Sequence, residues 1–162
     1  MKYPLALLLA GANAISLSVH AAEGTEGTEQ CPVADEAQVS ALFDRWNKDL
    51  ASGDPKQVAE NYAEESILLP TLSNLPRRSA EEKQDYFAHF LEKKPSGSVD
   101  ERMIQIDCNT ALDAGIYTFS FADGNEVKAR YTFTYKWYPE KDQWLITSHH
   151  SSAMPEIVQV LD

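Results

Sequence analysis

Three histidines in the body of the chain are the most obvious candidates for a metal site: His89, His149 and His150. His149 and His150 are adjacent in a segment that alternates like a strand, and adjacent strand residues point to opposite faces, so they cannot bind one ion together. His89 is predicted to lie on a helix, away from the apolar stripe that includes Phe87 and Phe90. The sequence therefore favours a site with no cofactor and no metal, with zinc or another divalent ion as the alternative.

Neutral polar side chains beside apolar ones form the other candidate group. Thr71 follows Pro70 at the end of a predicted buried strand, and Tyr86 flanks the apolar stripe of a predicted helix. The run His149-His-Ser-Ser152 places one histidine and one serine on each face of a strand, because residues two apart share a face. Hydroxyl and imidazole groups donate hydrogen bonds and transfer protons. Each residue alone also fits a structural role in a turn, core or strand.

Three helices are expected to position these side chains from the N-terminal half. Apolar residues recur every three or four positions between 36 and 52, which predicts an amphipathic helix that Gly53 ends. Asp54-Pro55 begins a second short helix, which we extend through Tyr62. Residues 67–69 form a short buried strand before Pro70. A capping box, Ser79-Ala-Glu-Glu82, then opens a third helix at 79–94.

After Pro95 apolar and polar residues alternate, which is typical of strands. Four long strands are expected at 99–109, 111–122, 126–138 and 143–152, with turn signals at 96–97, 113–115, 123–124 and 140–142. One face of the third is apolar: Val127, Ala129, Tyr131, Phe133, Tyr135 and Trp137. This order predicts an α+β fold in which N-terminal helices pack on a curved, mainly antiparallel sheet, forming a cone with an internal pocket.

The N-terminus has the features of a signal peptide. Lys2 precedes an apolar stretch, and Val19-His20-Ala21 suits a signal peptidase, so we expect cleavage after Ala21 and a periplasmic or secreted protein. A retained membrane anchor is the alternative, although polar residues interrupt the stretch. We assign residues 1–21 to the signal peptide, 22–34 to a flexible leader, 35–156 to a single domain and 157–162 to a C-terminal tail.

Charge and cysteine content limit the partners. The chain has 25 acidic residues against 14 Lys and Arg, a balance that repels phosphate backbones and anionic lipids, so we expect no nucleic-acid or membrane partner. An exported protein meets an oxidising environment, so Cys31 and Cys108 are expected to form a disulfide, with two free thiols as the alternative. The long strands leave one sheet face uncovered by helices, which favours a homodimer through the sheet.

Three runs of the sequence together resemble the iota-class carbonic anhydrases. They are Leu68-Leu-Pro-Thr-Leu-Ser73, residues 85–91 with the following Lys-Lys-Pro95, and residues 143–155 with the ending His-His-Ser-Ser. The resemblance spans residues 36–156. That family is related to the association domain of calcium/calmodulin-dependent protein kinase and shares the cone-shaped nuclear-transport-factor-like fold, so the resemblance implies this fold and the family's reaction.

The resemblance also implies a set of site residues. The family's catalytic threonine and tyrosine carry over to Thr71 and Tyr86, and its histidine and serine carry over to the closing motif, where we place them on His149 and Ser151. One alternative stays open. Strict alternation puts Trp144 on the face of His150 and Ser152, and if that face is the concave one, His150 and Ser152 belong to the pocket.

The implied reaction is the reversible hydration of carbon dioxide to bicarbonate, catalysed by a carbonate dehydratase, which is a lyase. The usual solution is a zinc ion that lowers the pKa of bound water from about 15.7 to about 7. The family includes members described as working without metal, so we expect pocket side chains to orient water, with proton transfer toward His149. Hydrogen bonds to the forming bicarbonate are expected from Thr71, Tyr86 and Ser151. Apolar walls are expected from Leu69, Phe87 and Phe90.

Two other functions fit the same fold. One is a non-enzymatic small-ligand-binding or oligomerisation module of the association-domain type. The other is a SnoaL-like isomerase, cyclase or dehydratase, which needs an Asp or Glu in the pocket as its base. The acidic candidate near the expected pocket, Asp85, falls on the exposed side of its helix, which counts against this last function.

Overall fold

The computed structural model describes residues 31–32 and 34–156. The expected signal peptide, nearly all of the leader and the C-terminal tail lie outside these residues, so their assignment stays a prediction. Within the described part of the chain, no helix has the length and apolar content that crossing a membrane requires.

The helices begin where their capping residues predict. Helix α1 (Glu36–Ser52) starts at a capping box between Asp35 and Gln38 and ends at Gly53, whose φ of 73° is left-handed. Helix α2 (Pro55–Ala59) follows its N-cap Asp54. Helix α3 (Ala80–Leu91) starts at the predicted Ser79 capping box but ends earlier than expected, before a left-handed residue at Lys94.

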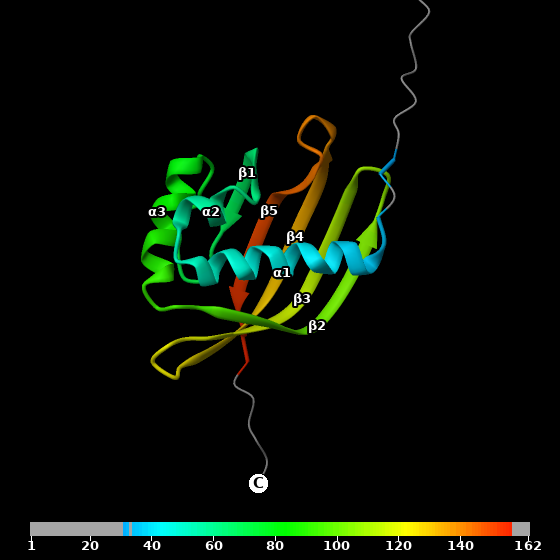
Figure 1. Ribbon diagram of the computed structural model, residues 1–162. Coiled ribbons are helices and arrows are strands. Elements are labelled where there is room, and N and C mark those ends of the chain that lie inside the picture. The colour runs from blue at the N-terminus through cyan, green and yellow to red at the C-terminus, as the bar shows by residue number, and fades with distance from the viewer. Residues whose placement is uncertain (1–30, 33, 157–162) are drawn as a thin grey trace, which may run out of the picture.

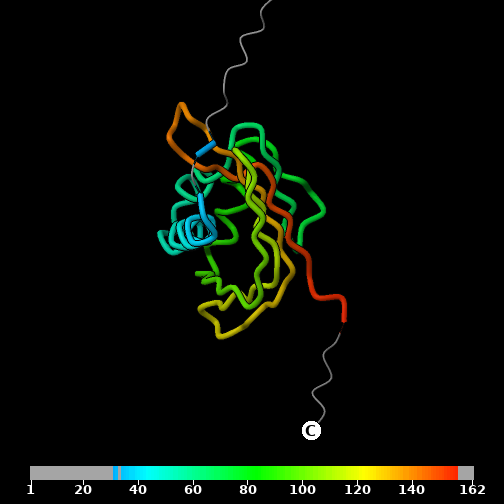
Figure 2. Tube along the Cα trace, turned by 90° about the vertical axis from the view of Figure 1, so that its right-hand side faces the viewer, coloured from blue at the N-terminus to red at the C-terminus, as the bar shows by residue number. Residues whose placement is uncertain are grey.

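Five strands form one sheet in the order β1-β5-β4-β3-β2. They are β1 (Tyr62–Leu69), β2 (Ser96–Ile106), β3 (Thr110–Ser120), β4 (Glu126–Tyr138) and β5 (Gln143–Ala153). Strand β1 runs parallel to β5, and the other neighbours are antiparallel. The helices lie together on one side of this sheet, and the strands bend toward the side that carries α1 (Figures 1 and 2). The expected α+β class is therefore confirmed.

Three local predictions were wrong. Residues 96–97, taken as a turn signal, are the first two residues of β2. Tyr62 begins β1 and pairs with Ile146, so it does not extend the second helix. Residues 113–115, taken as a turn signal, lie inside β3. Gly115 is needed there for packing, because a Cβ atom on it would lie 1.9 Å from the carbonyl oxygen of Glu101 on β2. The turn between these strands instead falls at 107–109, and Cys108 lies in it.

The core fills the space between the helices and the concave face of the sheet. The predicted apolar face of β4 is confirmed, since Tyr131, Phe133 and Tyr135 are buried. Phe133 packs against Trp46 of α1 with their ring centroids 5.5 Å apart. Fully burying one such side chain contributes about 1.5–3 kcal/mol, so this face anchors α1 on the sheet.

A β-bulge interrupts the alternation of β5. Tyr135 of β4 pairs with Ile146, whereas the preceding residue Thr134 pairs with Ser148, so Thr147 is one extra residue in the strand. The extra residue switches the faces to which the following side chains point.

The bulge decides which histidine and serine face the helices. Ile146 is buried before the bulge, and His149 and Ser151 are buried after it, at 4 % and 5 % exposure. His150 is exposed and Ser152 is half-buried on the opposite face. Trp144 and the pair His149 and Ser151 therefore share the concave side, which strict alternation does not allow.

A disulfide joins Cys31 to Cys108, which are 77 residues apart in sequence. Cys31 precedes α1, and Cys108 lies between β2 and β3. The bond ties the segment before the first helix to the end of the sheet.

Candidate functional site

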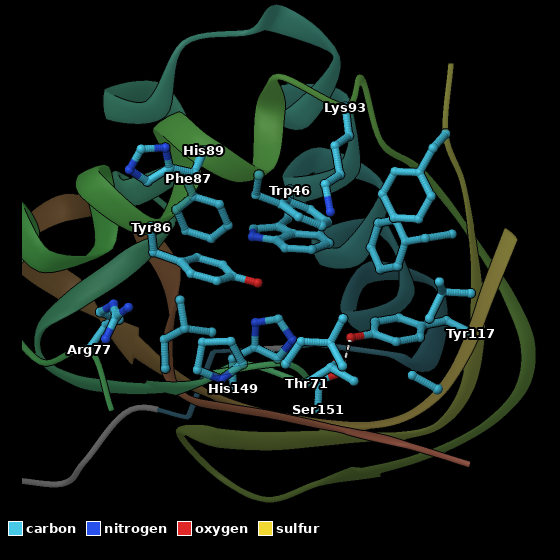
Figure 3. Close-up of a pocket in the computed structure, with 18 of the residues that line it drawn as sticks. Trp46, Thr71, Arg77, Tyr86, Phe87, His89, Lys93, Tyr117, His149 and Ser151 are labelled. Carbon is cyan, nitrogen blue, oxygen red and sulfur yellow. Dashed lines mark hydrogen bonds between the residues drawn. The ribbon is translucent and has the colours of Figure 1, made fainter. Parts of the chain in front are cut away.

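A cavity of about 310 Å³ lies between α1, α3 and the concave face of the sheet (Figure 3). Its apolar lining includes Trp46, Leu68, Phe87, Phe90, Phe119 and Ala129. Leu68 lines the cavity in place of Leu69, which the sequence analysis expected there. Adjacent strand residues point to opposite faces, and of these two Leu68 is the buried residue that faces inward.

All four site residues expected from the sequence line this one cavity. Thr71 follows the end of β1, Tyr86 comes from α3, and His149 and Ser151 come from β5. Figure 3 shows their side chains around the same part of the cavity. The structure thus brings the four residues together, while the roles proposed for them stay predictions.

Three hydroxyl groups form a chain at the sheet end of the cavity. Tyr117 of β3 donates a hydrogen bond of 2.6 Å to Ser151 Oγ, and Ser151 Oγ shares a further hydrogen bond with Thr71 Oγ1. Three hydroxyl hydrogens supply two bonds, so one hydrogen of Thr71 or Ser151 is left for a ligand. Burial raises the pKa of Tyr117 to about 12, which keeps this chain protonated at neutral pH.

His149 is buried and electrically neutral. Its Nδ1 is 2.9 Å from the hydroxyl of Tyr62 in β1, and its Nε2 is buried without a hydrogen-bond partner among the described residues. Its ring stacks on Phe133 with a centroid distance of 4.0 Å. Burial, with a smaller contribution from neighbouring His150, lowers the pKa of His149 to about 3. The ring therefore offers one unpaired nitrogen and no charge.

Tyr86 presents its hydroxyl to the cavity. Figure 3 shows this hydroxyl pointing inward, toward the space between Trp46 and His149. Burial raises the pKa of Tyr86 to about 12, an effect that the Arg77 guanidinium, 5.8 Å from the ring centroid, partly offsets. The hydroxyl is therefore a neutral hydrogen-bond donor.

The mouth of the cavity carries charge. Arg77 and Lys93 line it together with one carboxylate, Asp85. His89 lies there too, but its side chain is 76 % exposed and its Nδ1 is 3.8 Å from Glu92, so it does not approach His149. Within residues 31–32 and 34–156, no group of three or more His, Cys, Asp or Glu residues is placed to hold a metal ion.

A second buried polar group lies outside the cavity lining. Asp113 of β3 has no exposed surface, and its Oδ1 accepts hydrogen bonds from Tyr131, at 2.7 Å, and from Arg102 Nε, at 3.1 Å. Burial raises the pKa of this carboxyl group. Asp113 was not predicted as a site residue, because residues 113–115 have the composition of a turn.

Tyr62 and Tyr117 were also missed. Tyr62 was assigned to a helix, and its partner His149 is 87 residues away in the sequence. The inward position of Tyr117 could have been predicted, since it shares the inward face of its strand with Phe119. Its contact with Ser151 could not be predicted from the sequence, because it crosses the intervening strand β4.

Comparison with known families gives a match over almost all of the described chain. The profile of the calcium/calmodulin dependent protein kinase II association domain matches residues 35–155. The chain belongs to this association-domain family. None of the curated proteins matches it.

Solved structures agree with this family and with its fold. A Xanthomonas campestris protein assigned to the same association domain is 48 % identical, with a TM-score of 0.71, covering 78 % of this chain and 93 % of that chain. A nuclear-transport-factor-2-like protein of unknown function from Pseudomonas putida is 15 % identical, with a TM-score of 0.64, covering 78 % and 91 %. A protein of Parabacteroides distasonis assigned as a ketosteroid isomerase is 18 % identical, with a TM-score of 0.58, covering 73 % and 86 %. The last two show the fold alone, and this fold includes enzymes.

Proposed function

We propose that this association-domain protein is a carbonic anhydrase that hydrates carbon dioxide reversibly to bicarbonate. One observation carries the proposal: three neutral polar groups surround the same part of an apolar cavity. They are the unpaired Nε2 of His149, the hydroxyl of Tyr86 and the free hydroxyl of the Thr71 and Ser151 pair. Such groups suit a small product with three oxygen atoms.

The reaction requires little covalent chemistry from the protein. A water oxygen attacks the carbon atom of carbon dioxide, a C–O bond forms, and the electrons of one C=O bond move onto its oxygen. Apolar walls such as Phe87 and Phe119 accept the nonpolar substrate. Hydrogen bonds from Tyr86 and from the hydroxyl pair stabilise the negative oxygen as it develops, and the cavity holds the reactants in a productive orientation.

The expected proton transfer toward His149 needs revision. A pKa of about 3 makes this imidazole too weak a base to hold a proton at neutral pH. We therefore propose that His149 orients the water molecule or a bicarbonate oxygen. The proton released from water passes to solvent at the open mouth of the cavity, so that one carbon dioxide and one water give one bicarbonate and one proton.

Catalysis without a metal is part of this proposal. A metal ion would lower the pKa of the attacking water, and a metal-free site must replace that effect by orientation and by preorganised donors. The polar side chains of the lining include the hydroxyls of Thr71, Tyr86 and Ser151 and the imidazole of His149, and these groups suit hydrogen bonding to a substrate.

A stopped-flow hydration assay on chelator-treated protein tests the proposal. We expect activity to survive chelation, and Thr71→Val, Tyr86→Phe and Ser151→Ala each to lower kcat by about 100-fold, as the loss of an oxyanion donor does. His150→Ala is the matched control, since it removes a histidine from the opposite face of β5 and should leave the rate unchanged. Activity lost on chelation and restored by zinc contradicts the metal-free mechanism, and inactive protein under every condition contradicts the enzyme.

A small-ligand-binding or oligomerisation module is the second candidate, because the family match is to an association domain. Its homodimer would form through the uncovered face of the sheet. An isomerase or cyclase is supported less well. The acidic candidate Asp85 lines the cavity but is an exposed residue. The buried acid Asp113 is bonded to Arg102 and Tyr131 and does not line the cavity.

Export is proposed on the sequence alone. A signal peptide ending at Ala21 would give a mature protein that begins at Ala22, in the periplasm or outside the cell. Intact mass of the protein isolated from its native cell tests this, and a mass that includes Met1 contradicts it.

A further inference from the structure

We propose that Tyr62 is a positioning residue that holds His149 in the tautomer with its hydrogen on Nε2, so that His149 donates a hydrogen bond into the cavity. The inference concerns the geometry of two buried side chains, and its catalytic consequence rests on the proposed function. It gives a role to Tyr62, which does not line the cavity itself.

The pair is isolated from solvent. Tyr62 is 6 % exposed and His149 is 4 % exposed, and the 2.9 Å contact joins the tyrosine hydroxyl to Nδ1. A neutral imidazole carries one hydrogen, so the contact has two possible forms. Either Nδ1–H donates to the tyrosine oxygen, or the tyrosine O–H donates to a bare Nδ1.

The surroundings of the hydroxyl favour the second form. Among the described residues, His149 Nδ1 is the one hydrogen-bond partner of the Tyr62 hydroxyl. If Nδ1–H were the donor, the tyrosine hydrogen would be buried away from the cavity without an acceptor, which is costly. In the second form the hydrogen without a partner is on Nε2 of His149, a residue that lines the cavity, where a ligand can accept it. If Tyr62 donates, its hydrogen is satisfied and its oxygen remains an acceptor.

Trp46 supports the same assignment. Its Nε1–H is buried and has no hydrogen-bond partner among the described residues. This N–H lies near the Tyr62 oxygen and offsets part of the rise in the tyrosine pKa that burial causes, although its geometry falls short of a hydrogen bond. A nearby N–H donor favours the form in which the tyrosine oxygen stays an acceptor and its own O–H is donated to His149.

Lys83 strengthens Tyr62 as a donor. The lysine side chain is buried, its Nζ donates to the backbone oxygens of Ser66 and Arg78, and it lies 5.8 Å from the centroid of the Tyr62 ring. A cation over an aromatic ring withdraws electron density from it and so favours donation by the hydroxyl.

The assignment adds one hydrogen-bond donor to the part of the cavity that Tyr86, Thr71 and Ser151 surround. With its hydrogen on Nε2, His149 joins Tyr86 and the free hydroxyl of the Thr71 and Ser151 pair as a hydrogen-bond donor. Three donors that surround one part of the cavity suit a ligand that is rich in oxygen and carries negative charge. Bicarbonate has this character, whereas a neutral amine donor does not.

Nitrogen NMR of the full chain labelled with ¹⁵N-histidine tests the tautomer directly. The His149 signals are assigned by their loss in His149→Gln. We expect Nε2 to show the shift of a protonated nitrogen and Nδ1 that of a bare one. Tyr62→Phe should mix the tautomers, while Tyr135→Phe is the matched control, since the Tyr135 hydroxyl is buried on the same face of the sheet without a partner among the described residues.

Kinetics of carbon dioxide hydration gives the second readout. Tyr62→Phe should lower kcat by about 10-fold or more, in the range seen when the outer hydrogen-bond partner of a functional histidine is lost, while Tyr135→Phe leaves kcat unchanged. A wild-type His149 protonated on Nδ1, or tautomers that Tyr62→Phe does not change, overturns the inference. Inactive wild-type protein with the expected spectrum overturns the proposed function and leaves the positioning role of Tyr62 standing.

Discussion

The burial of His149 predicts that the protein loses stability in mild acid. The ordinary pKa of a histidine is 6.5, and burial lowers that of His149 to about 3. Above about pH 6.5 the ring is neutral in both the folded and the unfolded chain, so it contributes no pH dependence. Below that pH the unfolded chain binds a proton at this histidine and the folded protein does not, so protonation stabilises the unfolded state.

The size of the effect follows from the width of this window. Each pH unit between the two pKa values lowers the free energy of unfolding by about 1.36 kcal/mol. At about pH 4.5, two units below the unfolded value, the loss amounts to roughly 2.7 kcal/mol, and near pH 3 it is on the order of 5 kcal/mol. Asp113 acts in the opposite direction, because its raised pKa stabilises the folded state at low pH, and this contribution fades as the pH rises through its folded pKa.

Urea denaturation at about pH 7 and about pH 4.5 measures this loss. The test compares the wild type with His149→Gln, which removes the titrating ring and should remove most of the difference between the two pH values. Asp113 is present in both proteins, so its contribution cancels. His150→Gln is the control, since it removes an exposed ring and should keep most of the wild-type difference. An equal pH dependence in the wild type and in His149→Gln would refute the argument.

Three further predictions concern the frame around the site. Gly115→Ala should destabilise the fold by several kcal/mol, because the new Cβ would meet the Glu101 carbonyl oxygen at 1.9 Å, and an unchanged melting temperature would contradict this. Replacing Cys31 and Cys108 by serine should lower the free energy of unfolding by about 4 kcal/mol, because the disulfide closes a loop of 77 residues. Urea titration measures this loss, and equal stability of the two proteins would contradict the prediction. Ala114→Glu, on the uncovered sheet face, should convert the expected homodimer into monomers, and a wild-type monomer in light scattering would remove that prediction.

The parts of the fold that depend on local sequence could be predicted. Helix α1 has the bounds that its pattern indicated, because Asp35 and Gln38 cap its start and Gly53 ends it. The inward face of β4 was equally clear, since large apolar residues occupy every second position over the length of the strand. These signals need no knowledge of the neighbouring strands.

The parts of the site that depend on strand register could not be predicted from the sequence. The bulge at Thr147 leaves no mark in the composition of β5, yet it decides that His149 and not His150 faces the cavity. The partner of His149 follows from the pairing of β1 with β5, which brings Tyr62 beside the ring. Contacts of this kind become visible once the register is known.

Under the proposed function, the ionisation of Tyr86, Tyr117 and His149 means that the inner cavity would bind an anion with uncharged side chains. Tyr86 and Tyr117 keep their protons up to a pKa of about 12, and His149 stays neutral down to about 3. Between these limits the three side chains do not change charge, so they add no pH dependence near neutrality to the proposed reaction. The positive charge that attracts an anion lies at the mouth, on Arg77 and Lys93. In an acidic protein, these two cations beside one carboxylate make the mouth a local exception, and under the proposed function they would attract the anionic product to the route by which the proton leaves.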